Sequence, residues 1–121
     1  MNEKRALVVD DNESTRLLVE AALKRDGFST DTACDGAEAI RILDIDDGYD
    51  LIVLDLMMPE VDGYGVLDYL RQGAGFPQKL RKVIVITASP GLIQSDRLPT
   101  GLCEVILKPF TGERLLSSAC G

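Results

Sequence analysis

Four apolar stretches of the sequence run directly into a charged or hydroxyl-bearing residue. The residues are Asp10 and Asp11 after residues 6–9, Asp55 after residues 49–54, Thr87 at the end of residues 83–87, and Lys108 after residues 103–107. A carboxylate at the end of a buried strand is costly unless it is paired or used in chemistry. The pattern therefore indicates that these polar residues converge on one site.

The residue types of such a site define what it can do. Three carboxylates at one edge would repel one another, which implies a compensating cation. An all-oxygen ligand set suits Mg2+, which commonly combines one or two carboxylates with phosphate oxygens. With that ion and Lys108 drawing charge toward them, one ionised aspartate can attack phosphorus and become an acyl phosphate. Thr87 can hydrogen-bond a phosphoryl oxygen.

Taken singly, the same residues have structural interpretations. Lys108 near Asp55 fits a structural ion pair about as well as a functional group, and an Asp10–Asp11 pair fits a helix cap. Thr87 alone is an ordinary strand residue. Only the joint arrangement favours a phosphoryl site.

Strands and helices alternate along the chain. Apolar or alternating runs predict strands at residues 6–9, 28–33, 49–54, 83–87 and 103–107, and helical spacing predicts helices within 12–27, 35–43 and 59–71 and from residue 111 onward. This order predicts a single α/β domain over residues 1–121, with a parallel sheet covered on both faces. Ligands of such folds bind outside the carboxyl ends of the strands, which is where the polar residues lie.

The helix expected within residues 12–27 has an apolar stripe. Ser14 is the expected N-cap, and Leu17, Leu18, Ala21 and Ala22 form the expected buried face.

The segment between Thr87 and the last strand reads ASPGLIQSDRLPTGL. Ser89 and Pro90 can open a helix, but Pro99 disfavours helical geometry at Leu98. We expect a short or irregular fourth helix.

Composition excludes several functions. The formal net charge of −7 gives no basic stripe for nucleic acid binding through this domain. The apolar runs are too short to span a membrane or to act as a signal peptide, so we expect a cytoplasmic protein. Three cysteines without a CxxC pair, and no histidine, argue against a zinc site.

Four motifs in order resemble the receiver domain of bacterial two-component response regulators over essentially the whole chain. They are VVDD at 8–11, LDLMMPEVDG at 54–63, VIVITA at 83–88 and LKPF at 107–110. The resemblance implies a flavodoxin-like, doubly wound five-stranded parallel sheet of order 2-1-3-4-5.

The resemblance also implies roles for the site residues. Asp55 would be the phosphoacceptor, and Asp10, Asp11, Asp55 and the main-chain carbonyl of Met57 would hold Mg2+. Thr87 would be the switch hydroxyl and Lys108 the family's lysine, followed by a cis bond to Pro109.

A domain of this kind is a switch and not an enzyme. The resemblance implies a phosphohistidine on a histidine kinase or histidine phosphotransfer domain as the donor, and an effector domain or downstream protein as the target. We expect a monomer or a weak homodimer through the last two helices and the fifth strand.

Two departures from the family pattern concern switching and lifetime. Val105 stands where family members often carry an aromatic ring that moves with the switch hydroxyl. Met57 and Ser89 occupy positions that tune hydrolysis of the acyl phosphate, and a thioether orients water poorly. We expect a comparatively long-lived phosphorylated state.

Three other functions compete with this one. A Mg2+-dependent phosphatase of the haloacid dehalogenase type uses a strand-end aspartate but has a second acid two residues later, where this chain has Met57. A flavin or nucleotide binder needs a phosphate-binding first loop, whereas DDNEST begins with two negative charges. A phosphorylation-independent interaction module would not need the complete set of site residues.

Overall fold

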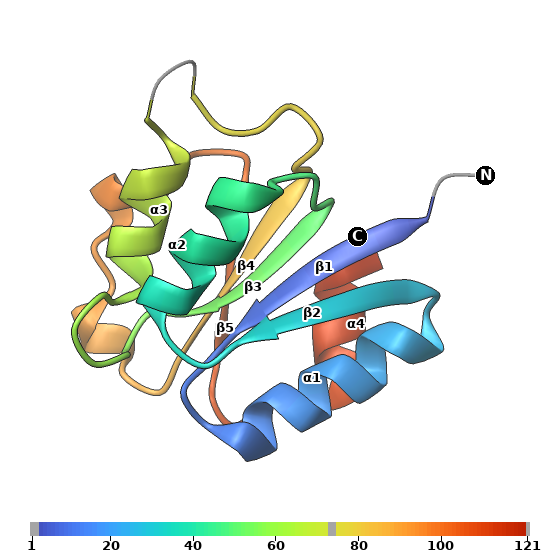
Figure 1. Cartoon of the computed structure of the whole chain (residues 1–121). Coiled ribbons are helices and arrows are strands. Elements are labelled where there is room, and N and C mark those ends of the chain that lie inside the picture. The colour runs from blue at the N-terminus through green and yellow to red at the C-terminus, as the bar shows by residue number, and fades with distance from the viewer. Residues whose placement is uncertain (1–2, 73–74, 121) are drawn as a thin grey trace.

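A parallel five-stranded sheet with helices on both faces forms the protein (Figure 1). The computed structural model describes residues 3–72 and 75–120. The strands are β1 (Lys4–Val9), β2 (Phe28–Ala33), β3 (Leu51–Asp55), β4 (Lys82–Thr87) and β5 (Cys103–Leu107). The helices are α1 (Glu13–Arg25), α2 (Gly36–Ile45), α3 (Gly63–Leu70) and α4 (Gly112–Cys120).

The strand order β2-β1-β3-β4-β5 confirms the predicted flavodoxin-like arrangement. Every residue of the central strand β3 is buried, as expected for a strand covered on both faces. In the edge strand β2, only the two end residues, Phe28 and Ala33, are buried, and the residues between them are more exposed.

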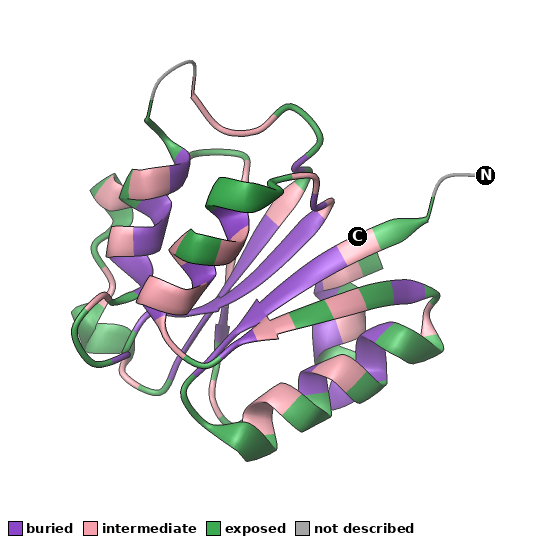
Figure 2. Ribbon diagram, viewed as in Figure 1, coloured by how far each residue is buried: buried purple, intermediate pink, exposed green. Residues whose placement is uncertain are grey.

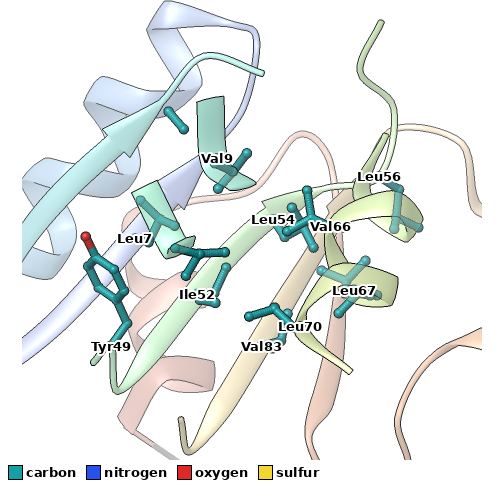
Figure 3. Close-up of a cluster of buried hydrophobic side chains, with 14 of the residues drawn as sticks. Leu7, Val9, Tyr49, Ile52, Leu54, Leu56, Val66, Leu67, Leu70 and Val83 are labelled. Carbon is teal, nitrogen blue, oxygen red and sulfur yellow. The ribbon is translucent and has the colours of Figure 1, made fainter. Parts of the chain in front are cut away.

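Alternate side chains of the strands enter two separate core layers. In β1, Leu7 and Val9 belong to the layer under α2 and α3, and Ala6 and Val8 to the layer under α1 and α4. Figure 3 shows the first layer, in which Leu7, Val9, Ile52, Leu54 and Val83 of the sheet lie with Val66, Leu67 and Leu70 of α3. Burial colouring in Figure 2 places the sheet at the centre and exposed residues on the outer helix faces. Burial on both sides fixes the register and brings the strand ends to one edge.

Helix α1 differs from the prediction in its cap and in its buried face. The N-cap is Asn12, whose side chain accepts a hydrogen bond from Thr15 N, and not Ser14. The buried residues are Val19, Ala22 and Leu23, while Leu17 and Leu18 are 58% and 39% exposed. The apolar residues of α1 cover a wider part of the helix than the face that packs on the sheet. Which of them are buried therefore depends on how the helix is oriented after β1.

Helix α3 begins at Gly63, inside the predicted range 59–71. Asp62 caps it by accepting from Gly65 N. Residues 59–62 are irregular and lie in the connection between β3 and α3.

The segment between β4 and β5 has no α-helix, which confirms the expected irregularity. It contains two single-turn 3-10 helices, η1 (Pro90–Leu92) and η2 (Ser95–Arg97). In Figure 1 these orange turns lie beside α3. Over the described ranges 3–72 and 75–120, every helix falls short of the length and apolarity needed to cross a bilayer.

Candidate functional site

The carboxyl ends of β1, β3 and β5 bring three acids and a lysine together. Ligand atoms of Asp10, Asp11 and Asp55 all lie within 4.8 Å of one another. Lys108 Nζ lies 2.9 Å from Asp10 Oδ2 and 3.3 Å from Asp55 Oδ2. The convergence expected from the strand-end pattern is therefore present.

Asp10 is buried completely and is held by its own loop. Its Oδ1 accepts a hydrogen bond from Asn12 N at 2.8 Å, and its main-chain carbonyl accepts from Arg16 Nη1 at 2.8 Å. Within the described part of the chain, Oδ2 accepts no hydrogen bond of regular geometry and has only its ion-pair contact with Lys108. A buried carboxylate oxygen of this kind has capacity for a cation.

Asp55 is only 2% exposed. Its Oδ1 accepts a hydrogen bond from Met57 N at 3.0 Å, and its Oδ2 faces Lys108. Burial raises the pKa of Asp55 to about 6, with a further contribution from the negative charge of Asp10. The hydrogen bond from Met57 N and the charge of Lys108 oppose this rise. The carboxyl of Asp55 therefore loses its proton less readily than an exposed aspartate does.

Lys108 is the only positive group that contacts both buried acids among the described residues. Burial acts to lower its pKa, but the close contact with Asp10 and the negative charges of Asp55 and Asp10 raise it overall. The Lys108–Pro109 peptide bond is cis, as the resemblance implied.

Thr87 ends β4 and is fully buried. Its Oγ1 accepts a hydrogen bond from Ser89 N at 3.1 Å, so the hydroxyl is engaged with its own loop. Its carbonyl accepts from Lys108 N at 2.8 Å, which ties the ends of β4 and β5 together.

Met57 lies at the rim, with its side chain 47% exposed. Its amide is part of the site through the hydrogen bond to Asp55. The role of its carbonyl as a metal ligand stays a prediction.

Two further residues position the site and were missed in the sequence. A Cβ at Gly63 would lie 2.7 Å from Asp55 O and 2.8 Å from Leu56 Cα, so only glycine lets α3 start against the end of β3. Arg16 fastens the β1–α1 loop through Asp10 O. The helix-start glycine was visible in the sequence as a weak signal, but nothing marked Arg16 among the other basic helix residues.

The acids fit a hard divalent ion. Carboxylate oxygens are the ligands that Mg2+ prefers, and Asp11 is exposed, so water has access to the cluster. A surface cavity of about 680 Å³ lies instead at the opposite edge of the sheet, among Lys4, Phe28 and Cys120, and contains none of these acids.

Comparisons with known proteins show the family of this chain. A family model described as the response regulator receiver domain matches residues 6–119. A probable transcriptional regulator, ycf27 of Cyanophora paradoxa, is 38% identical over 118 residues, which are 95% of this chain and 46% of that protein. PhoP of Bacillus subtilis, an alkaline phosphatase synthesis transcriptional regulatory protein, is 38% identical over 112 residues, 89% of this chain and 43% of that protein.

Solved structures of response regulators have the same fold as this chain. The chemotaxis response regulator CheY4 of Vibrio cholerae has a TM-score of 0.82 and 26% identity, with 98% of each chain covered. A CheX–CheY–BeF3–Mg2+ complex from Borrelia burgdorferi has a TM-score of 0.81 and 28% identity, with 96% of this chain and 86% of that chain covered. The chain spans less than half the length of the two curated relatives.

Proposed function

We propose that this chain, which belongs to the response regulator receiver domain family, accepts a phosphoryl group on Asp55 from a phosphohistidine. The observation that carries the proposal is the position of Asp55, whose carboxylate lies beside Asp10 and Asp11 and 3.3 Å from the ammonium of Lys108. A buried carboxylate in such surroundings can act as a nucleophile, and the ammonium of Lys108 offsets part of the negative charge that its product would carry.

The transfer exchanges one bond to phosphorus for another. A carboxylate oxygen of Asp55 forms the new P–O bond while the P–N bond to the donor imidazole breaks, and the imidazole nitrogen keeps the electron pair. Met57 N holds Asp55 Oδ1 at 3.0 Å, which leaves the carboxylate in a fixed orientation. Lys108 is placed to offset negative charge on the phosphoryl oxygens.

Asp10, Asp11 and Asp55 would hold Mg2+, together with the carbonyl of Met57. The fit rests on the three converging carboxylates, two of which, Asp10 and Asp55, are buried and share the single ammonium of Lys108. When bound, the ion supplies positive charge that neutralises the transferring phosphoryl group. The CheY of Borrelia burgdorferi was solved with BeF3 and Mg2+, which supports the same ligand class here.

Thr87 would respond to the modification. Its hydroxyl is buried at the end of β4, next to β3 in the sheet, and it accepts a hydrogen bond from the amide of Ser89. We expect Thr87 to exchange this contact for a phosphoryl oxygen, to which it would donate a hydrogen bond.

The cellular role follows from the same chemistry. The donor would be a histidine kinase or a histidine phosphotransfer domain in the cytoplasm, and the output an effector domain or a downstream protein. The chain would act as a switch without turnover of its own, as a monomer or a weak homodimer. The complete set Asp10, Asp11, Asp55, Thr87 and Lys108 argues against a module that has lost phosphorylation.

One experiment tests the acceptor directly. The protein is incubated with Mg2+ and acetyl phosphate, and intact mass spectrometry is used to look for a single phosphoryl adduct. We expect the adduct in the wild type and in Asp47→Asn, which changes an exposed acid remote from the site, and its loss in Asp55→Asn. An undiminished adduct in Asp55→Asn would overturn the assignment, and turnover of a phosphate ester would favour the phosphatase.

A further inference from the structure

Side chains of helix α3 and its C-cap contact the irregular segment between β4 and β5. Tyr64 and Asp68 are one turn apart on α3, and Arg71 caps the end of the helix about one turn further on. All three contact residues 92–97, and we call this set of contacts the α3 clasp.

The centre of the clasp is the hydroxyl of Tyr64. It accepts a hydrogen bond from Gln94 N at 2.6 Å and donates one to Leu92 O at 3.4 Å. The Tyr64 side chain is nearly buried, at 6% exposed, although the residues of η1 and the position of Gln94 itself are exposed. The hydroxyl thus satisfies two main-chain groups of a segment that has no helix to satisfy them.

Arg97 closes the clasp from the far end of the segment. Its guanidinium lies over the Tyr64 ring, 4.5 Å from the centroid, and pairs with Asp68 Oδ2 at 2.8 Å. Arg71 Nη2 donates to the carbonyl of Arg97 at 3.1 Å. Stacking and pairing of one guanidinium make the far end of the segment depend on the position of α3.

The near end of the segment depends on Thr87. Ser89 N donates to Thr87 Oγ1, and Ser89 O accepts from Leu92 N at 3.0 Å to form the turn of η1. A movement of the Thr87 hydroxyl therefore removes the partner of Ser89 and displaces the turn that leads to Leu92 and Gln94. The contacts of Tyr64 with Leu92 and Gln94 lie three and five residues after Ser89, so they would be disturbed by this displacement.

We propose that the α3 clasp is the switch element of this domain: it holds residues 89–97 on α3 in the unphosphorylated protein and opens when Thr87 turns toward the phosphoryl group. The inference rests on the proposed function. It gives the chain a route for the signal although Val105 supplies no aromatic ring, and it makes residues 89–97 and the uncovered face of α3 the surfaces that change. The clasp is a two-state contact that phosphorylation biases.

Amide exchange at two positions, measured by NMR with Mg2+ and beryllofluoride as the phosphoryl mimic, tests the proposal. Met57 N donates a hydrogen bond to Asp55, so its NMR signal indicates whether beryllofluoride occupies the site. Gln94 N donates a hydrogen bond to Tyr64, so its exchange rate indicates whether the clasp is closed. We expect the Met57 signal to shift on loading and Gln94 exchange to become about three- to tenfold faster, the size of one lost hydrogen bond.

Variants separate the clasp from general loosening. Tyr64→Phe keeps the buried ring but removes the hydroxyl, so we expect fast Gln94 exchange without beryllofluoride and little further change with it. In the wild type, binding of beryllofluoride must also open the clasp, whereas in Tyr64→Phe the clasp is already open. Beryllofluoride should therefore bind about three- to tenfold more tightly to Tyr64→Phe than to the wild type. Arg97→Ala, at a more exposed position, should act in the same direction.

The matched control is Tyr69→Phe, on the same helix. Its hydroxyl donates to Asp44 Oδ1 at 2.9 Å and not to the segment, so its exchange and its affinity should equal those of the wild type. In Thr87→Ala, loading should shift Met57 but leave Gln94 exchange unchanged.

The outcomes distinguish the two proposals. If Met57 does not respond to beryllofluoride, the proposed function fails. If Met57 responds while Gln94 exchange stays constant or slows, the proposed function stands and the clasp does not act as the switch. Equal affinities of Tyr64→Phe and Tyr69→Phe for beryllofluoride would also overturn the clasp.

Discussion

The ammonium of Lys108 lies 3.3 Å from Asp55 Oδ2, although β4 separates the strands that carry them. The lysine reaches over the end of β4 and also contacts Asp10 at 2.9 Å. One cation is therefore shared by two buried carboxylates, and the local negative charge still exceeds the positive charge. We expect stability, metal binding and phosphorylation all to depend on that imbalance.

Removal of Lys108 should leave two buried acids without a counter-charge. We expect Lys108→Met to lower the free energy of unfolding by about 3–5 kcal/mol in urea titrations near neutral pH without metal. Adding Asp55→Asn to Lys108→Met should recover a large part of the loss, because one of the two charges disappears. If Lys108→Met alone were as stable as the wild type, this account would be contradicted.

The raised pKa of Asp55 predicts how stability depends on pH. Folding raises the pKa from 3.8 to about 6, so the folded state binds the proton more tightly than the unfolded chain does. The stabilisation that the protonated Asp55 gives the folded state is complete below pH 3.8 and is lost as the pH rises toward about 6. The stability of Asp55→Asn relative to the wild type should therefore increase over this window by up to about 3 kcal/mol and then level off. Urea titrations in metal-free buffer measure the difference, and a flat difference across the window would refute it.

Mg2+ should reverse the penalty of the acidic cluster. At a large excess over its dissociation constant, about a hundredfold, the ion should raise the free energy of unfolding by about 2.7 kcal/mol. Asp10→Asn should lose most of this gain, while the exposed control Asp47→Asn should retain it. Thermal unfolding in Mg2+ and in chelator gives the comparison, and equal gains in both variants would exclude the site.

The contact of Gly63 with the end of β3 should be intolerant of a methyl group. In Gly63→Ala the added Cβ would overlap main-chain atoms of Asp55 and Leu56, and we expect a loss of about 1–3 kcal/mol together with slower phosphorylation. Gly91→Ala is the matched control because a Cβ there meets nothing within 4 Å. Similar stabilities of the two variants would show that α3 can move away from β3 without cost.

Met57 should govern the lifetime of the acyl phosphate. Its thioether is half exposed next to the phosphoacceptor loop and orients water poorly, whereas an amide can hold an attacking water. We expect Met57→Asn to speed dephosphorylation several-fold, as followed by the decay of the phosphoryl adduct in mass spectra. An unchanged or slower decay would rule out this role.

The sequence was sufficient for the fold and for the convergence of Asp10, Asp11, Asp55 and Lys108 at one edge of the sheet. The apolar runs ending in Asp10, Asp55 and Thr87 are buried strands, and parallel strands necessarily share one carboxyl edge. Pro99 correctly predicted the loss of a regular helix before β5 because its effect on Leu98 is local. Such features depend on neighbouring residues and on the alternation of side chains.

Other features depended on contacts between distant segments. Leu17 and Leu18 are as apolar as Leu23, yet only Leu23 is buried, because the path of the chain out of β1 decides which stripe of α1 faces the sheet. The hydroxyl of Tyr64 meets Gln94 across 30 positions, and no local pattern marks either residue. The sequence by itself therefore determined the elements, their order and the acids and lysine at their ends. The tertiary structure decided which surfaces face each other, how one ammonium is shared by two carboxylates, and what holds the irregular segment on α3, because burial and pairing are properties of the folded neighbourhood rather than of the residue.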